Sequence, residues 1–513
     1  MTRKTIQLIA TCLTAGLILL FVGANIVFAK DTVNVGIQYD PATLNALGIK
    51  TELDIFLISH INENLIGFNL ETGISEITKN ALAESIRVVK NGKGIKFRIK
   101  KDIRFHTGDL LTAHDVKFTY EQCLNPENGN IMAGYLDEIE EIEILDNHNF
   151  IFHLYEPSAS WRNLGIIGIC SKKYYEKVGG EEFRSQPVGS GPFRYISRKR
   201  GESVTLEAVE DHRMGPEFKT LNFKVVPDEI KRIEMLESGE LDLISHIQPS
   251  NVERLKKKAH IKVKSAIVPS LHALSLKQDT YPIMRDNKLG QAIMMGINRQ
   301  ELVDNIFLGE GYPLYMYTNK IELGYDPKYS VEFNPSKARE LVNQSSYKPD
   351  TPLILTYHSG FPNAKQVVSA IQKYLQDIGI TVKTYEFDTK VFYTYARTKD
   401  KRLGHLAVYG MGGGRDPNLR LLVTLPSDGP YNSYSERPRQ KEMDALVYAQ
   451  GKEMNQKKRL LILKKLHRIL QSDYTYIPLF GLNVIYAMND SVDYEWLQGV
   501  SNFSQLNSIK ILK

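Results

Sequence analysis

Residues 97–118 read Phe-Arg-Ile-Lys-Lys-Asp-Ile-Arg-Phe-His-Thr-Gly-Asp-Leu-Leu-Thr-Ala-His-Asp-Val-Lys-Phe, and this stretch decides the fold. It begins with a strand pattern over residues 96–99. Thr107-Gly108-Asp109 is then typical of a turn, and residues 114–123 read as a helix with Asp115 in its first turn. Taken alone, the stretch is structural, because core and surface histidines are far commoner than catalytic ones. We expect Phe105 and Phe118 to lie in the core, and we expect no catalytic role for His106 and His114.

Short strands alternate with amphipathic helices along the rest of the chain. The apolar patterns predict strands over residues 32–37, 150–154 and 380–387. The predicted helix caps are Asp228, Asn298 and Asn455 at the start of helices, and Gly239 and Gly379 at their ends. This alternation favours an α/β protein with mixed sheets.

The chain has 513 residues, which is too long for a single core and suggests about three domains or subdomains. Hydrophobic residues make up 42% and charged residues 24%, as in an ordinary soluble protein. The net charge is +6, and residues of both signs are interspersed along the chain. Without a basic stripe or a nucleic-acid motif, a nucleic acid is not an expected partner.

The N-terminus has the pattern of an export signal. Two basic residues precede an apolar run over residues 8–22, and Val27-Phe28-Ala29 provides the small residues of a cleavage site. We therefore expect residues 1–29 to be removed and the mature chain to begin at Lys30. An uncleaved anchor helix is the alternative, because this segment is just long enough to span a bilayer. Cys12 lies inside the apolar run instead of at its end, which argues against a lipid anchor and favours a soluble periplasmic protein.

Six segments together resemble the peptide/nickel class of extracytoplasmic solute-binding proteins, which includes the oligopeptide- and dipeptide-binding receptors of ABC importers. Any one of them is weak evidence alone, but their order and spacing cover nearly the whole mature chain. The segments are residues 97–118, Val188-Gly-Ser-Gly-Pro-Phe-Arg-Tyr195, residues 226–243, residues 291–303, Leu375-Gln-Asp-Ile-Gly-Ile380 and Ile477-Pro-Leu-Phe480.

The resemblance implies a two-lobed, periplasmic-binding-protein-like fold that closes on its ligand, with an extra subdomain on the first lobe. Carried onto this sequence, the first lobe comprises three separate parts of the chain, the extra subdomain interrupts it, and the second lobe precedes the C-terminal return. The implied divisions are 30–61 and 187–275 for the first lobe, 62–186 for the extra subdomain, 276–484 for the second lobe and 485–513 for the return to the first lobe.

Two cysteines of the mature chain, Cys123 and Cys170, fall in the implied extra subdomain. Their spacing suits no zinc site. In an oxidising compartment they are able to pair, which requires their Cα atoms to lie within about 7 Å. Two separately buried thiols are the equal alternative.

The candidate ligand loop is Tyr409-Gly-Met-Gly-Gly-Gly-Arg-Asp-Pro417. A predicted strand leads into it, and α/β proteins bind ligands at strand ends. Its consecutive glycines allow a close approach of a ligand to the backbone and positive φ angles. A solvated surface turn is the alternative, and the resemblance favours the ligand site. The candidate contacts in this loop are Tyr409, Gly412, Gly413, Gly414, Arg415 and Asp416.

The loop departs from the family's peptide-binding pattern at one position. Typical peptide receptors have an Asp four residues before the loop's Pro, where it binds the ligand's ammonium group, and this chain has Gly413 there. Asp416 remains as an acid and is either a ligand contact or structural. Arg415 adds a charge suited to a carboxylate. An anionic or acylated ligand is therefore favoured over one with a free amine.

Three softer candidates lie outside the loop. The resemblance places His358 after a strand in the same region, and Asn432 and Tyr434 in a segment similar to the family's Asn-x-x-Tyr stretch. His358 is also a candidate contact for a metal or metallophore, although a lone His is more often a loop residue. No His/Cys/Asp cluster has metal-ligand spacing, so no metal and no cofactor is expected.

The resemblance implies a non-enzymatic receptor that captures a small ligand, a peptide or a peptide-like and anionic solute, and delivers it to the permease subunits of an ABC importer. A receptor for nickel, a metallophore or another small solute of the same class is the alternative. A secreted hydrolase is the rival from another class, but the chain has no Gly-x-Ser-x-Gly, His-Glu-x-x-His or P-loop motif. A monomer is expected.

Overall fold

The computed structural model describes residues 30–68, 75–78, 80–433, 437 and 439–512. The predicted signal peptide over residues 1–29 lies outside the described residues. Within the described ranges, no helix combines the length and the apolar character needed to cross a bilayer.

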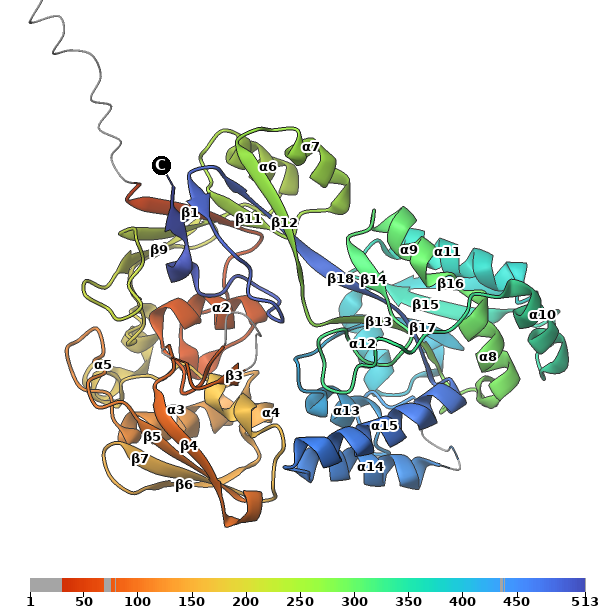
Figure 1. Cartoon of the computed structure of the whole chain (residues 1–513), viewed down its shortest axis with the longest axis horizontal. Coiled ribbons are helices and arrows are strands. Elements are labelled where there is room, and N and C mark those ends of the chain that lie inside the picture. The colour runs from red at the N-terminus through yellow and green to blue at the C-terminus, as the bar shows by residue number, and fades with distance from the viewer. Residues whose placement is uncertain (1–29, 69–74, 79, 434–436, 438, 513) are drawn as a thin grey trace, which may run out of the picture.

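The elements fall into three groups, which Figure 1 shows as two lobes and a smaller sheet below the first lobe. The first lobe comprises β1 (Thr32–Ile37), α2 (Glu52–Ile61), β8 (Phe193–Lys199), β9 (Ser203–Ala208), β10 (Thr220–Val225), α6 (Glu229–Glu237), β11 (Leu243–Ser245), α7 (Val252–Lys256), β12 (Ile261–Ile267), β19 (Val492–Asp493) and β20 (Lys510–Ile511). The extra subdomain comprises β2 (Gly67–Phe68), β3 (Ser75–Glu76), β4 (Ala83–Val89), β5 (Gly94–Ile99), α3 (Ala113–Leu124), α4 (Ala133–Leu136), β6 (Ile139–Ile144), β7 (Asn149–Leu154) and α5 (Lys172–Ser185). The second lobe comprises β13 (Ser270–Leu276), α8 (Asn287–Gly296), α9 (Arg299–Ile306), β14 (Gly311–Pro313), α10 (Pro335–Gln344), β15 (Leu353–His358), α11 (Ala364–Asp377), β16 (Val382–Phe387), α12 (Thr389–Arg397), β17 (Leu406–Gly412), α13 (Asn418–Thr424), α14 (Gln440–Lys452) and α15 (Gln456–Asp473).

One mixed sheet runs through both lobes, in the order β16-β15-β17-β13-β18-β11-β1-β10-β9-β8, with β12 and β14 also paired to β18 (Tyr476–Asn489). The first half of β18 pairs with β13 and β14 in the second lobe, and its second half pairs with β11 and β12 in the first. Figure 1 shows β18 passing from one lobe to the other. The predicted α/β fold with mixed sheets and two lobes is confirmed, whereas the predicted residue boundaries stay predictions.

The helix caps predicted from the sequence are present in the structure. Asp228, Asn298 and Asn455 each accept a hydrogen bond from a backbone N–H in the first turn of α6, α9 and α15. A side-chain oxygen at this position satisfies an amide that has no partner within the helix. Gly239 and Gly379 follow their helices with φ angles of 81° and 90°, in the left-handed region that glycine tolerates.

The stretch over residues 97–118 forms β5, a turn and the first part of α3. Gly108 has a φ of 88° in the turn, as the sequence indicated. Asp115 and Thr112 form a capping box at the start of α3. The second carboxylate oxygen of Asp115 accepts the backbone N–H of Lys172, at 2.9 Å, so this one buried acid caps both α3 and α5.

The turn of this stretch packs directly on the segment that contains Gly189 and Gly191. His106 Nε2 donates to the Gly191 carbonyl at 3.0 Å, and Nδ1 accepts the Gly189 N–H at 3.4 Å. A Cβ on Gly189 would lie 2.0 Å from the Ile61 carbonyl oxygen, and a Cβ on Gly191 would lie 2.6 Å from that of His60. Both glycines are therefore needed for close backbone packing, and His106 has a structural role.

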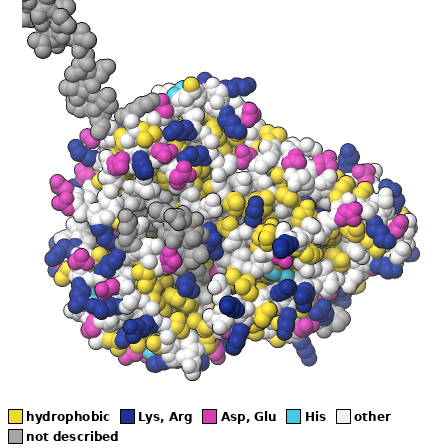
Figure 2. Space-filling model, viewed as in Figure 1, with side chains coloured by type: hydrophobic (Ala, Val, Ile, Leu, Met, Phe, Trp, Pro, Cys, Tyr) yellow, Lys and Arg dark blue, Asp and Glu magenta, His cyan; other side chains and the backbone are white. Residues whose placement is uncertain are grey.

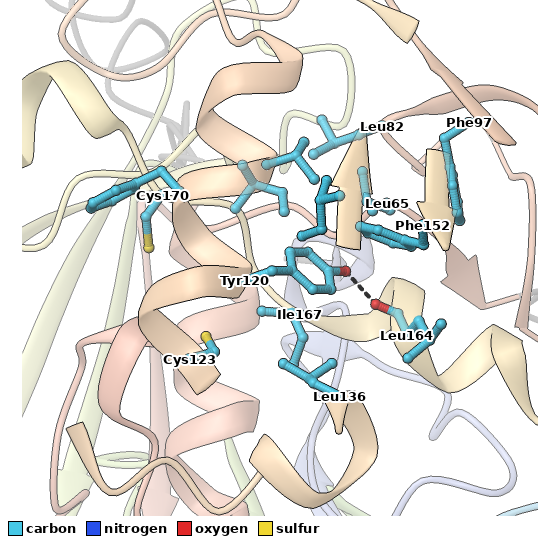
Figure 3. Close-up of a cluster of buried hydrophobic side chains, with 14 of the residues drawn as sticks. Leu65, Leu82, Phe97, Tyr120, Cys123, Leu136, Phe152, Leu164, Ile167 and Cys170 are labelled. Carbon is cyan, nitrogen blue, oxygen red and sulfur yellow. Dashed lines mark hydrogen bonds between the residues drawn. The ribbon is translucent and has the colours of Figure 1, made fainter. Parts of the chain in front are cut away.

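The extra subdomain has its own core between the β4-β5-β7-β6 sheet and its helices. Phe105 and Phe118 belong to this core, as predicted. Figure 3 shows Cys123 and Cys170 within it, together with the hydrogen bond from the Tyr120 hydroxyl to the Leu164 carbonyl. Both cysteines are free and buried, so the structure has separate thiols instead of the disulfide that was the alternative. Burial raises the pKa of Cys123 to about 12.

Candidate ligand-binding site

Two parallel strands of the second lobe end at the same edge of its sheet. β15 and β17 pair in parallel, so His358 at the end of β15 and Gly412 at the end of β17 lie at neighbouring carboxyl ends. The antiparallel strand β13 begins beside them, with Ser270 opposite Gly412. Residues 412–417, which we call the glycine loop, continue from this edge, where α/β sheets place ligands.

The glycines of this loop differ in one respect from the sequence-based expectation. None of Gly412, Gly413 and Gly414 has a positive φ, and Gly412 is the last residue of β17. All three glycines are exposed. A Cβ added to Gly412 would have no described atom within 4 Å. A Cβ on Gly413 would lie 3.5 Å from Asn319 Nδ2, and a Cβ on Gly414 would lie 3.8 Å from a backbone nitrogen. No contact with the described residues requires glycine at these positions, so they leave exposed backbone that a ligand is able to approach.

Arg415 reaches from the glycine loop to the first-lobe side of the molecule. Its Nη2 lies 3.5 Å from the carbonyl oxygen of Gln498, in the segment that follows β19. The guanidinium also packs against Gly499, where an added Cβ would lie 3.0 Å from Nε. The side chain is half-buried, and its Nε is buried with no hydrogen-bond partner among the described residues. Burial lowers the pKa of Arg415, but a guanidinium stays charged at neutral pH.

Asp416 is held inside the protein by three donors. Arg459 Nη1 and Nη2 donate to its two carboxylate oxygens at 2.6 and 2.7 Å, in the bidentate geometry typical of Arg and carboxylate. The backbone N–H of Asn418 donates to Oδ1 at 2.9 Å. Of the two roles that the sequence left open for Asp416, these contacts favour the structural one.

Tyr409 and His358 lie behind the loop, in the interior of the second lobe. The ring of Tyr409 packs edge-on against Phe392 of α12 at 5.3 Å between centroids, and only 3% of the residue is exposed. His358 is buried against Phe392 and Tyr393, its Nδ1 lies 3.2 Å from Thr389 Oγ1, and burial lowers its pKa. In the part of the chain that the structure describes, the Tyr409 hydroxyl and His358 Nε2 are both buried without a hydrogen-bond partner.

The predicted Asn-x-x-Tyr segment is described only in part. Asn432 is fully buried, and its Nδ2 donates to the Pro426 carbonyl at 2.6 Å, so it holds a turn of the chain. Tyr434 lies outside the described residues. The structure thus gathers Gly412 to Asp416 in one loop with His358 at the adjoining strand end, while Tyr409 and Asn432 are packed in the interior.

Residues that contact the loop from elsewhere in the chain were not identified from the sequence. Asn319 Nδ2 lies 3.4 Å from the Gly414 carbonyl and donates to Glu322 at 2.9 Å. Glu322 in turn forms a buried ion pair with Arg420. The backbone N–H of Leu323 donates to the Arg415 carbonyl at 2.8 Å. These residues lie in an irregular segment without periodicity, so no local signal marks them.

The groups that this edge of the sheet offers are the guanidinium of Arg415 and the exposed backbone of the glycine loop. Among the described residues, no group of three or more His, Cys, Asp or Glu is arranged to hold a metal ion. Figure 2 shows Lys/Arg and Asp/Glu side chains interspersed over the visible face of the molecule.

Comparisons with known proteins give matches along most of the chain. The model of a protein family described as bacterial extracellular solute-binding proteins, family 5 Middle, matches residues 78–432. The oligopeptide-binding protein AppA of Bacillus subtilis is 25% identical, over 63% of this chain and 64% of AppA, which is less than two thirds of that relative. Di/tripeptide-binding protein 3 of Pseudomonas aeruginosa is 26% identical, over 96% of each protein. The crystal structure of the ABC transporter substrate-binding protein CtaP of Listeria monocytogenes matches with a TM-score of 0.85 and 21% identity, over 94% of this chain and 99% of CtaP.

Proposed function

The chain belongs to the bacterial extracellular solute-binding proteins of family 5, and from this premise we propose that it captures a peptide or peptide-like solute carrying an anionic group and delivers it to the permease subunits of an ABC importer. The names of relatives support a peptide ligand, since AppA and di/tripeptide-binding protein 3 are named for binding oligopeptides and di- or tripeptides.

The proposal that the solute carries an anionic group rests on the burial and hydrogen bonding of Arg415. Its guanidinium is half-buried between the glycine loop and the 498–499 segment, and within the described ranges it has one long hydrogen bond and an Nε without an acceptor. A buried donor without a partner costs about 1–3 kcal/mol. A ligand carboxylate would satisfy this donor by two parallel hydrogen bonds, which gives both affinity and orientation.

The composition of the loop also supports a ligand without an ammonium group at this point. Gly413 stands where peptide receptors of this class have an acid, and the one acid of the loop, Asp416, is already paired with Arg459. A free ammonium group would thus meet the like charge of Arg415, while the charge of Asp416 is already paired, which disfavours its binding.

The remaining parts of the proposal concern location and assembly. Membership of an extracellular family supports export, with residues 1–29 as a cleaved signal peptide and the periplasm as the destination. We propose that the receptor acts as a monomer, and that it releases its solute chemically unchanged, as a binding protein and not as an enzyme.

Calorimetry with paired peptides tests the proposed ligand class. A panel of di- and tripeptides, each as the free acid, the C-terminal amide and the N-acetylated acid, is titrated into the mature protein. We expect free acids and acetylated acids to bind, and amides to bind at least about 30-fold more weakly, as expected for a lost charged contact. Equal binding of acids and amides would contradict the role of Arg415, and no binding by any peptide would contradict the peptide class.

A further inference from the structure

The extra subdomain touches the second lobe at a contact beside the glycine loop. The backbone N–H of Ala159 donates to the Gly451 carbonyl at 2.7 Å, and Asn418 Nδ2 donates to Ser160 Oγ at 3.0 Å. Met454 adds an apolar contact, since it packs against the core of the extra subdomain. This contact joins parts of the chain that are more than 250 residues apart in sequence.

A chain of buried hydrogen bonds connects this contact to the loop. Gln450 Nε2 donates to Asn418 Oδ1 at 2.7 Å, and Arg459 Nε and Nη2 donate to Gln450 Oε1 at 3.1 and 2.9 Å. Arg459 then holds Asp416 by its two short bonds. Asn418, Gln450 and Arg459 are 5%, 0% and 4% exposed, so water does not compete for these bonds.

Asn418 bonds to the extra subdomain through its side chain and to the glycine loop through its backbone. Its side chain bonds Ser160 in the extra subdomain, while its backbone N–H bonds the Asp416 carboxylate in the loop. A movement of the extra subdomain away from the second lobe would break the first bond and leave the amide of Asn418, and with it Gln450, without a fixed position. Asp416 directly follows Arg415, so its position determines where the candidate ligand contact lies.

We propose that Ser160, Asn418, Gln450 and Arg459 form a latch that favours closure of the two lobes before any ligand arrives, with Arg459 and Gln450 as positioning residues of the glycine loop. The latch bonds to Ser160 and Ala159 exist only while the extra subdomain and the second lobe touch. They therefore add to the stability of the closed state and of no other. A ligand that binds the closed state gains apparent affinity in proportion to the fraction already closed.

A single added methyl group provides a sharp test. A Cβ on Gly451 would lie 2.8 Å from Asn418 Oδ1, so Gly451→Ala should displace the Asn418 amide from the latch. Gly451 lies in α14 and has no positive φ, so alanine favours the helix itself and folding should not suffer. Gly134→Ala is the matched control, because Gly134 lies in α4 and a Cβ there meets nothing within 4 Å.

Small-angle X-ray scattering of the mature chain, freed of bound solute by unfolding and refolding, measures the closure. We expect wild type and Gly134→Ala to give the scattering curve calculated from this structure. Gly451→Ala and Asn418→Ala should give a larger radius of gyration, because each neutral hydrogen bond lost shifts the closed-to-open ratio by roughly 5-fold.

Two outcomes would overturn the latch: an unchanged radius of gyration in both variants, or a wild-type protein that is already open without ligand. Thermal melts of all four proteins show whether each variant is folded. The role of the latch in positioning a ligand contact rests on the proposed function. The scattering experiment contains no ligand, so its failure and a wrong ligand class are distinguishable.

Discussion

Replacing Arg415 by alanine removes the side chain on which the proposed ligand class depends. The guanidinium contributes little to the empty protein: in the described part of the chain its one side-chain hydrogen bond is the 3.5 Å contact with the Gln498 carbonyl, which is too long to be strong. We therefore expect Arg415→Ala to leave the melting temperature of the ligand-free protein unchanged.

The expected loss of affinity follows from the burial of the guanidinium. Removing one partner of a buried charged pair costs about 2–5 kcal/mol. Arg415 is half-buried, so solvent screens part of the interaction and the lower end of this range applies. A loss of about 2 kcal/mol corresponds to roughly 30-fold weaker binding. Arg415→Lys should recover only part of this, because an ammonium group does not make two parallel bonds to a carboxylate.

Calorimetry with the peptide acid that wild type binds most tightly measures these values. Arg254→Ala is a suitable control, because Arg254 is an exposed first-lobe residue paired with Glu237 and far along the chain from the glycine loop. Wild-type affinity in Arg415→Ala would refute the reasoning, and so would an equal loss in Arg254→Ala. A lower melting temperature in Arg415→Ala would show that the side chain is structural.

Four further results are expected. N-terminal sequencing of the exported protein should begin at Lys30, and a full-length product in the membrane fraction would contradict cleavage. Cys123 and Cys170 should react with a thiol reagent only after unfolding, since both are buried and the pKa of Cys123 is raised to about 12; two reactive thiols in the native protein would refute this burial. Gly191→Ala should lower the melting temperature or prevent folding, because its Cβ would lie 2.6 Å from a backbone oxygen; a wild-type melt would contradict the close packing. Burial lowers the folded-state pKa of His272, like that of three other histidines, from 6.5 to about 4. The stability that the neutral ring provides is therefore present above pH 6.5 and is lost as the pH falls toward 4, by up to about 1.4 kcal/mol per pH unit for each group. Equal free energies of urea unfolding at pH 7.5 and pH 5 would contradict this expectation.

The helix caps that the sequence predicted correctly depend on residues close together in the chain. The caps Asp228, Asn298 and Asn455 formed because a side-chain oxygen reaches the first turn of its own helix. The two-lobed fold followed from the order of family motifs, since no periodicity by itself reveals how β18 is shared between lobes.

The features that the sequence did not reveal depend on distant contacts. The packing of Tyr409 on α12, through Phe392, joins two elements of the second lobe and leaves no signal in the loop sequence itself. The glycines of the loop allow positive φ angles, but none of the three adopts one. The partners of Asp416 and Arg415, Arg459 and Gln498, lie far from the loop in sequence, so no local pattern indicates these contacts.

Native mass spectrometry of the protein, purified from the exported fraction without denaturation, tests the central claim most directly. A solute receptor should carry an intact small molecule as a mass adduct, and tandem fragmentation should identify a peptide or peptide-like acid. The adduct should disappear on unfolding, rebind after refolding, and keep its mass during prolonged incubation with the protein. An adduct that the protein converts to products, or a protein that neither carries nor rebinds any small molecule, would contradict the account.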